Sequence, residues 1–329
     1  NMRKLAVSLC LISALLILTG GGALGKEKVT FAYLDDVAWR PAFYAIEEGK
    51  IRSDLIEVET KVLDIPALLQ ATGVKQFDVV TTAAVAPPKL AQRGLQVKIM
   101  NVVLAARTKG TSIFVRKDSG IESPRDIKGK TLAVSSLGST VATYMRIALN
   151  KKYGLNVDMK KGDIKFTEAP MESILGLLLR KGIDAGYLFH TPAFKASQVA
   201  DLKVLTYIPQ DYLEVAGVLP IDAIAVTYPE TIAKKGHLLK ELNRMLAASR
   251  QYLRDHPEEV FTAVSKRYGV DAAFLRDWYA NQYDIPLTWN PELHRRLETI
   301  WRLAKEIGDM PPVGLEPERY LWKELWVEK

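Results

Sequence analysis

Hydrophobic residues alternate with polar ones, or form short blocks bounded by glycine and proline, through the first two-thirds of the chain. Blocks of this length, rich in β-branched and aromatic residues, are typical of strands. Strands are expected at 28–34, 55–63, 75–82, 97–105 and 112–116. Helices are expected between them, at 42–48, from Pro66, and from Pro87 to Arg93, with proline at a favourable first-turn position. This alternation predicts an α/β fold.

The pattern then returns about a hundred residues later. Each copy has a proline that opens a helix, an aspartate beside the next strand and a second proline that opens another helix. These landmarks are Pro66, Asp78 and Pro87 in the first copy and Pro170, Asp184 and Pro192 in the second. Two units of one design indicate two similar α/β lobes.

The segment 130–153 combines a strand, a small-residue loop and a helix. Thr131 to Val134 is a short apolar run, Ser135 to Thr140 is the loop, and a helical pattern continues to Gly154. The amides and positive dipole end of such a helix start attract anions and carbonyl oxygens. The alternative is an ordinary helix capped by serine or threonine.

A helical tail follows the strand expected at 222–228. Beyond Pro229, apolar residues recur at helical spacing in segments 232–253, 271–283 and 291–307, and Asp255 to Glu259 reads as another helix start. Most tryptophans of the tail are expected in the core.

The first 25 residues read as a secretory signal. Arg3 and Lys4 precede an apolar run from Leu5 to Leu18, and small residues lead to a cleavage site after Gly25. An uncleaved anchor is the alternative. The chain is therefore expected in the periplasm or elsewhere outside the cytoplasm.

Cysteine and charge exclude several function classes. Cys10, the only cysteine, lies within the signal, so the mature chain could form no disulfide, thiolate nucleophile or cysteine metal site. The net charge of +7, or +5 without Arg3 and Lys4, is spread among acidic residues rather than clustered. A nucleic-acid partner is not expected, because its footprint would cluster basic residues.

An ordered set of short motifs runs through nearly the whole mature chain. The motifs are PAFYAIEEG at 41–49, FDVV at 77–80, VRKDSGI at 115–121, DIKGK at 126–130, LGST at 137–140, KGIDA at 181–185 and HPE at 256–258. Their order and spacing resemble the periplasmic solute-binding proteins of ABC transporters for nitrate, sulfonates, taurine and thiamine pyrimidine precursors.

The resemblance implies the type II periplasmic binding protein fold, with two α/β lobes, a hinge and a helical C-terminal tail. Lobe 1 would comprise 26–115 and 222–329, and lobe 2 would comprise 116–221. It also implies a monomer without cofactor or enzymatic activity, which captures a small-molecule solute between the lobes by hinge closure and delivers it to an ABC permease.

The expected ligand-binding residues end strands or begin helices at this cleft. They are Asp35, Asp36, Trp39, Thr81, Thr82, Ala83, Gly138, Ser139, Thr140, Tyr187, Phe189, His190 and Asp222. The aromatic residues could stack on a planar ligand or pack in the core. The acids could contact ligand N–H groups or cap helices. A metal is not expected, because His190 lacks the partners that a metal site needs.

The ligand class and the function stay open at this point. The Gly138–Thr140 turn favours an anion such as nitrate or a sulfonate, whereas the acids and aromatic residues favour a pyrimidine-like heteroaromatic ring. Two other functions compete with transport. One is an enzyme on the same fold, similar to a pyrimidine synthase or a dehydratase, with a carboxylate such as Asp222 or Glu168. The other is a ligand-sensing partner of a membrane receptor.

Overall fold

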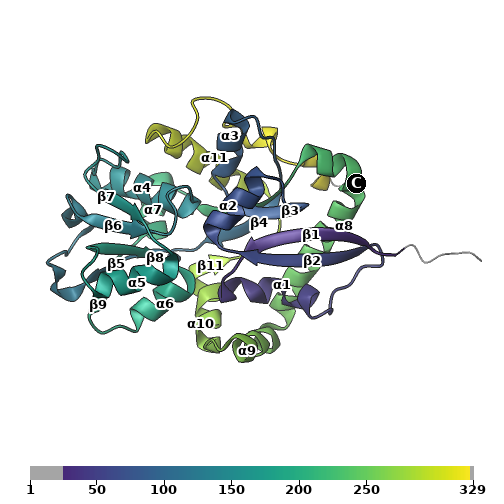
Figure 1. Ribbon diagram of the computed structural model, residues 1–329, viewed down its shortest axis with the longest axis horizontal. Coiled ribbons are helices and arrows are strands. Elements are labelled where there is room, and N and C mark those ends of the chain that lie inside the picture. Colours follow the sequence, from purple (N-terminus) through teal and green to yellow (C-terminus); the bar gives the residue numbers. More distant parts are fainter. Residues whose placement is uncertain (1–24, 327–329) are drawn as a thin grey trace, which may run out of the picture.

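The computed structural model describes residues 25–326. The predicted signal at 1–25 lies outside this range except for Gly25. Figure 1 shows two lobes side by side, one formed by the middle of the chain and one by its beginning and end. Within residues 25–326, no helix is both long enough and apolar enough to cross a bilayer.

The first lobe contains a six-stranded sheet with the order β11-β4-β10-β3-β1-β2. Its strands are β1 (Glu27–Leu34), β2 (Ile56–Leu63), β3 (Val79–Ala83), β4 (Lys98–Ala106), β10 (Ile221–Thr227) and β11 (Tyr283–Asp284). β1 runs parallel to β2 and β3, whereas β10 is antiparallel to both β3 and β4. The helices of this part of the chain are α1 (Arg40–Glu47), α2 (Ile65–Gly73) and α3 (Ala86–Gln92), and a 3-10 turn, η1 (Val37–Trp39), precedes α1.

The second lobe contains a five-stranded sheet with the order β7-β6-β8-β5-β9. Its strands are β5 (Ser112–Arg116), β6 (Thr131–Val134), β7 (Lys165–Glu168), β8 (Ala185–Leu188) and β9 (Leu202–Tyr207). Its helices are α4 (Thr140–Tyr153), α5 (Met171–Leu179), α6 (His190–Ser197) and α7 (Ile208–Ala216). The sequence pattern did not predict β7, β9 or α7.

The chain crosses between the sheets at 107–111 and at 217–220. The expected first boundary at 115/116 falls inside β5, because β5 pairs with β8 and β9 rather than with the first sheet. The crossing therefore lies a few residues earlier than the motif pattern suggested.

The repeated aspartates have the same structural role in both lobes. Asp78 Oδ2 accepts a hydrogen bond from the backbone N–H of Thr30 at 2.9 Å, and Asp184 Oδ2 accepts one from the N–H of Thr131 at 2.8 Å. In each lobe the carboxylate ahead of one strand thus pairs with a backbone donor of the neighbouring parallel strand, which explains why the two copies share this residue.

The tail contains α8 (Pro229–Asp255), α9 (Pro257–Tyr268), α10 (Ala272–Asp277) and α11 (Pro291–Glu306), with a π-helical turn at Trp278–Gln282. It is not entirely helical, because β11 pairs with β4 at the edge of the first sheet. Trp278, Trp301 and Trp322 are buried, as expected. The tail also reaches the second lobe, where Asp309 pairs with Arg146 of α4 at 3.1 Å.

Candidate functional site

Two adjoining cavities lie between the lobes. The inner cavity has a volume of about 60 Å³ and the outer one about 710 Å³. Both are lined by Leu34, Ile65 and Leu69, so the outer cavity leads to the inner one. The inner cavity has room for a few water molecules only, so a ring-sized ligand requires side chains or lobes to move apart.

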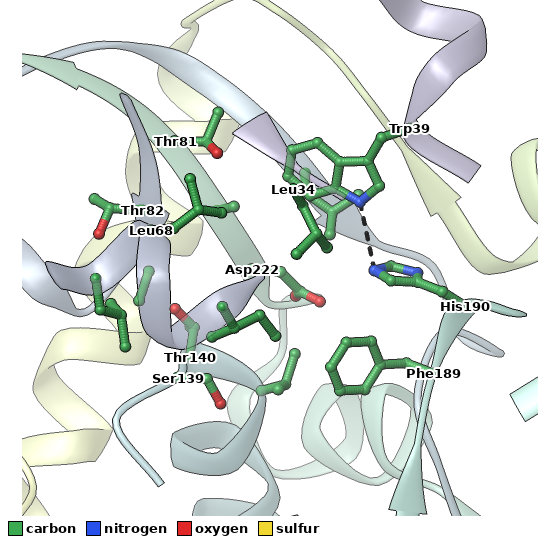
Figure 2. Close-up of a pocket in the computed structure, with 16 residues that line it drawn as sticks. Leu34, Trp39, Leu68, Thr81, Thr82, Ser139, Thr140, Phe189, His190 and Asp222 are labelled. Atoms are coloured by element: carbon green, nitrogen blue, oxygen red, sulfur yellow. Dashed lines mark hydrogen bonds between the residues drawn. The ribbon is translucent and has the colours of Figure 1, made fainter. Parts of the chain in front are cut away.

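Most of the expected site residues line the inner cavity (Figure 2). The first lobe contributes residues from η1, β3 and β10, and the second lobe contributes residues from the start of α4 and the end of β8. They are Trp39, Thr81, Thr82, Ala83, Ser139, Thr140, Phe189, His190 and Asp222. Figure 2 shows Asp222 near the centre, with Trp39, His190 and Phe189 on one side and Ser139 and Thr140 on another.

Asp35 and Asp36 line the outer cavity together with three further acids, Asp64, Glu168 and Glu172. Asp36 also caps η1, since its Oδ1 accepts a hydrogen bond from the N–H of Ala38 at 2.8 Å, which confirms the capping alternative for one of the pair. Burial raises the pKa of Asp36 to about 7.

Tyr187 and Gly138 line neither cavity. Tyr187 has no exposed surface and donates a hydrogen bond to Thr111 Oγ1 at 2.6 Å, so it lies behind the cavity wall instead of stacking on a ligand. Gly138 lies opposite Leu69, where an added Cβ would be 3.6 Å from a leucine methyl. A side chain at this position would make ordinary contact with Leu69, so the space between the lobes does not by itself require glycine here.

The hydrogen-bonding groups at the start of α4 are largely occupied. Ser139 Oγ donates to the carbonyl of Ser136 at 2.7 Å and accepts from the N–H of Ala142 at 3.3 Å. The N–H of Leu137 donates to Glu168 Oε1 at 2.5 Å, so a carboxylate of the protein already holds the place of an anion at this turn. The alternative of an ordinary capped helix therefore applies to Ser139.

Asp222 is 5% exposed, and only one of its oxygens is hydrogen-bonded in the described structure. Oδ2 accepts from the hydroxyl of Tyr144 at 3.2 Å, whereas Oδ1 has no partner among residues 25–326. Burial raises the pKa of this carboxyl to about 8 despite the opposing effects of the Tyr144 and Tyr283 hydroxyls and of Arg296. Arg296 does not touch it, because its guanidinium donates to the carbonyls of Leu219, Ala106 and Pro220.

A chain of hydroxyls leads to Asp222 from the second lobe. Tyr187 donates to Thr111, Thr111 and Tyr144 are 3.1 Å apart, and Tyr144 donates to Asp222. The Tyr144 hydroxyl at the end of this chain donates to Oδ2, which leaves Oδ1 as the oxygen that faces the cavity without a partner among residues 25–326.

His190 is held by two indoles, Trp278 from the tail and Trp39 from η1. Trp278 Nε1 lies 3.0 Å from Nδ1, and Trp39 Nε1 lies 3.4 Å from Nε2. Burial lowers the pKa of His190 to about 3, so the ring is neutral and has one acceptor nitrogen for two indole donors. We assign that acceptor to Nδ1, which has the shorter contact, and the proton to Nε2, so that the longer contact with Trp39, dashed in Figure 2, is the one without an acceptor.

The sequence interpretation missed the apolar wall formed by Ile65, Leu68 and Leu69 of α2. The expected helix at Pro66 was the available signal, but nothing in its pattern showed which face meets the cleft. Trp278 was expected only in the core, and its contact with His190 depends on the tail returning to the cleft. Among residues 25–326, no three His, Cys, Asp or Glu side chains converge as metal ligands would.

Three solved structures have the same architecture and align with this chain over almost the whole of their own length. Protein AF1704 from Archaeoglobus fulgidus is 19% identical, with a TM-score of 0.71 over 85% of this chain and 98% of its own. The periplasmic aliphatic sulphonate binding protein SsuA from Escherichia coli is 16% identical, with a TM-score of 0.69 over 92% of this chain and 99% of its own. The alkanesulfonate-binding protein SsuA from Xanthomonas axonopodis pv. citri, bound to MOPS, is 14% identical, with a TM-score of 0.69 over 90% of this chain and 98% of its own.

These similarities confirm the type II periplasmic binding protein fold that the motifs implied. No curated protein matches the sequence. The family itself is one that the motifs did not suggest. A family model described as menaquinone biosynthesis matches residues 29–304, and the chain therefore belongs to the menaquinone biosynthesis family.

Proposed function

We propose that the chain is a receptor for a small molecule, which it binds between its lobes and delivers, outside the cytoplasm, to an ABC permease. The cleft supports binding most directly. It is lined from both lobes, and at its inner end one oxygen each of Thr81, Thr82 and Asp222 has no partner among residues 25–326. Buried polar atoms without partners are costly, so a ligand that satisfies them gains affinity.

Binding is expected to proceed in two steps. A ligand enters through the outer cavity and meets the first lobe at β3 and β10, and the loops of the second lobe then close over it. The closed form would present to the permease a surface that spans both lobes. The cavity supplies no nucleophilic thiol, and Ser139 is occupied as a helix cap, so we propose no covalent chemistry.

A thermal-shift screen of the full chain tests this function. The panel holds nitrate, bicarbonate, taurine, alkyl and aryl sulfonates, aromatic carboxylates, pyrimidines and flavins. A ligand at a hundred times its dissociation constant should stabilise the fold by about 2.7 kcal/mol. Thr81→Val should weaken the hit, whereas Thr60→Val, on β2 and away from both cavities, should not. A hit that is recovered unchanged and is insensitive to Thr81→Val would contradict binding at this site.

Membership of the menaquinone biosynthesis family supports the other candidate, an enzyme on the same fold, better than it supports delivery to a permease. Asp222 supplies the relevant group, because a buried carboxyl that stays protonated near neutral pH can transfer a proton to or from a bound substrate. Mass spectrometry of the recovered ligand separates the candidates. If the ligand is chemically converted, and if Asp222→Asn abolishes this conversion while binding persists, the protein is an enzyme. Recovery of the ligand unchanged would favour the receptor.

A further inference from the structure

The net positive charge of the chain is concentrated in the second lobe. Residues 112–216, which form that lobe, contain 15 lysines and arginines against 11 aspartates and glutamates, a net charge of +4. The chain without residues 1–25 has a net charge of +5 in total. The first lobe and the tail together are therefore almost neutral, and the excess of positive charge lies on the second lobe.

More than half of the cations of this lobe have acidic partners. Lys152, for example, pairs with Asp211 at 2.8 Å and with Glu214 at 2.6 Å. Four exposed lysines have no carboxylate within 4.0 Å among residues 25–326. These four form the lysine patch, which consists of Lys130, Lys160, Lys161 and Lys165.

The fold brings the lysine patch together from two separate segments. Lys130 precedes β6 and Lys165 begins β7, and these strands are parallel neighbours at one edge of the second sheet, on the left of Figure 1. The N–H of Lys165 donates to the carbonyl of Lys130 at 2.9 Å. Lys160 and Lys161 lie in the turn that leads into β7. The sequence shows no run of basic residues because the cluster forms only when the two strands pair.

The acids at this end of the sheet are used within the turns. Asp158 Oδ1 accepts hydrogen bonds from the backbone N–H groups of Lys160 and Lys161 at 2.8 and 2.7 Å. Asp163 Oδ1 pairs with Lys128 at 3.2 Å, which is not part of the patch. The carboxylates thus hold the backbone that carries the lysines, while the ammonium groups of the patch remain available to an external anion.

The composition of this surface favours one kind of partner. Segments 128–130 and 156–165 contain no arginine and no aromatic residue, which proteins commonly use to read bases or to stack on them. The exposed large apolar side chain here is Met159, 39% exposed, which is too little for the apolar centre of a stable protein–protein interface. Flexible lysines around a single apolar side chain suit a diffuse anionic surface such as lipid headgroups.

The lysine patch lies at the end of the second sheet that is opposite the cleft. β7 runs from Lys165 to Glu168, and Glu168 lines the outer cavity. The two ends of this four-residue strand are about 10 Å apart. A flat surface in contact with the patch therefore meets the lobe at the far end of the sheet from the cavity mouth.

We propose that the lysine patch binds the surface of an anionic lipid bilayer and holds the protein there by electrostatic attraction. The inference goes beyond the proposed function. It concerns a different surface and applies to a receptor and to an enzyme alike.

Flotation of the full chain with lipid vesicles tests the proposal. Vesicles of equal parts phosphatidylglycerol and phosphatidylcholine should bind the protein more tightly at low ionic strength than vesicles of phosphatidylcholine alone. The ratio of the two affinities is the readout, because an apolar contribution from the predicted signal is common to both. The ratio should approach one in about 1 M salt, where the Debye length falls to about 3 Å.

Two charge-matched variants connect this ratio to the patch. Lys160→Gln combined with Lys161→Gln should lower it at least about tenfold, because each lysine near an anionic surface strengthens binding by about fivefold. Glutamine keeps the backbone N–H groups that bind Asp158, so the turn should still fold. Lys266→Gln combined with Lys305→Gln removes the same charge from exposed positions on α9 and α11 and should leave the ratio unchanged.

Two results would overturn the proposal directly. One is equal affinity for the two kinds of vesicle, and the other is a ratio that the Lys160 and Lys161 substitutions do not change. A short DNA duplex serves as a competing polyanion. If the duplex binds more tightly than the anionic vesicles and the same substitutions weaken it, the patch belongs to a nucleic-acid site and the membrane proposal fails.

Discussion

The phenol of Tyr144 donates a hydrogen bond across the lobe boundary to Asp222 Oδ2 at 3.2 Å. Tyr144 belongs to the first helix of the second lobe, and Asp222 to the strand by which the chain returns to the first. The contact ties the polar centre of the cleft to the position of α4. Any motion that separates the lobes at this point therefore changes the electrostatic environment of Asp222.

Tyr144→Phe should raise the pKa of Asp222 further, since the lost hydrogen bond favours the charged form. A rise of about 1 pH unit corresponds to a hydrogen bond of about 1.4 kcal/mol. Carbon-13 NMR of labelled aspartate carboxyls measures it, with Asp222→Asn for assignment. Tyr212→Phe is a matched control, because Tyr212 is equally buried but its hydroxyl has no partner among the described residues. Equal shifts in both variants would contradict the role of Tyr144.

Asp222 should make the protein less stable as pH rises. Its folded pKa of about 8 lies above the ordinary value of 3.8, so the folded state holds the proton more tightly than the unfolded state. The stabilisation from this proton is complete below the unfolded pKa of 3.8 and is lost as the pH rises through the folded pKa of about 8. Urea unfolding should show the advantage of Asp222→Asn over wild type growing by about 1.4 kcal/mol per pH unit within this window. A constant difference across the window would exclude the raised pKa.

His190 should make the folded protein less stable as the pH falls. Its folded pKa of about 3 lies below the ordinary 6.5, so the unfolded state takes up the proton first and stability falls as pH drops below the higher value. Long-range nitrogen–proton NMR spectra should also show a protonated Nε2 and an unprotonated Nδ1. A proton on Nδ1 would mean that Trp39, not Trp278, is the indole that donates to this ring.

Replacement of Thr81 by valine should separate stability from binding. Its hydroxyl is buried without a partner in the described structure, so Thr81→Val removes an unsatisfied group and should leave stability unchanged or raise it by about 1 kcal/mol. Ligand affinity should fall in the same variant. Thr72→Val provides the contrast, because the Thr72 hydroxyl donates to the carbonyl of Leu68 at 2.8 Å. A loss of stability in Thr81→Val would indicate a structural partner for that hydroxyl.

The ion pair between Asp309 of the tail and Arg146 of α4 should contribute more to the free energy of unfolding than an exposed ion pair does. Asp309→Ala leaves Arg146 without its carboxylate, and because the Arg146 side chain is only 5% exposed the expected loss is about 3 kcal/mol. Glu306→Ala breaks the exposed pair with Lys151 on the same surface and should cost at most about 1 kcal/mol. Denaturant unfolding compares the two. Similar losses would show that burial does not strengthen the Asp309 contact.

The sequence predicted the fold well because its signals are local. Prolines open α2, α8 and α11 within their first turns, and the paired Asp78 and Asp184 mark equivalent strands in both lobes. Two of the elements it missed, β7 and β9, are half-exposed strands of the second sheet, and their short pattern differs little from that of a loop.

The site was only partly predictable, since strand ends can be located from sequence but side-chain directions cannot. Thr81, Thr82, Phe189 and Asp222 do line the cleft, whereas Tyr187 points into the structure behind it. The occupied turn before α4 depends on Glu168, which is 31 residues away from Leu137. No local pattern reveals such a contact, and this is why the anionic alternative could not be weighed from the motifs.

The position of β10 also constrains the order in which the protein can form. β10 lies between β3 and β4, which follow one another in the chain but do not pair. The second lobe is continuous in sequence and can fold as soon as its residues emerge from the ribosome. The first sheet, in contrast, stays divided until residue 221 has been synthesised, with the edges of β3 and β4 unpaired. The lobe that begins the chain is thus the last to be completed, and its long-range pairing should set the folding rate.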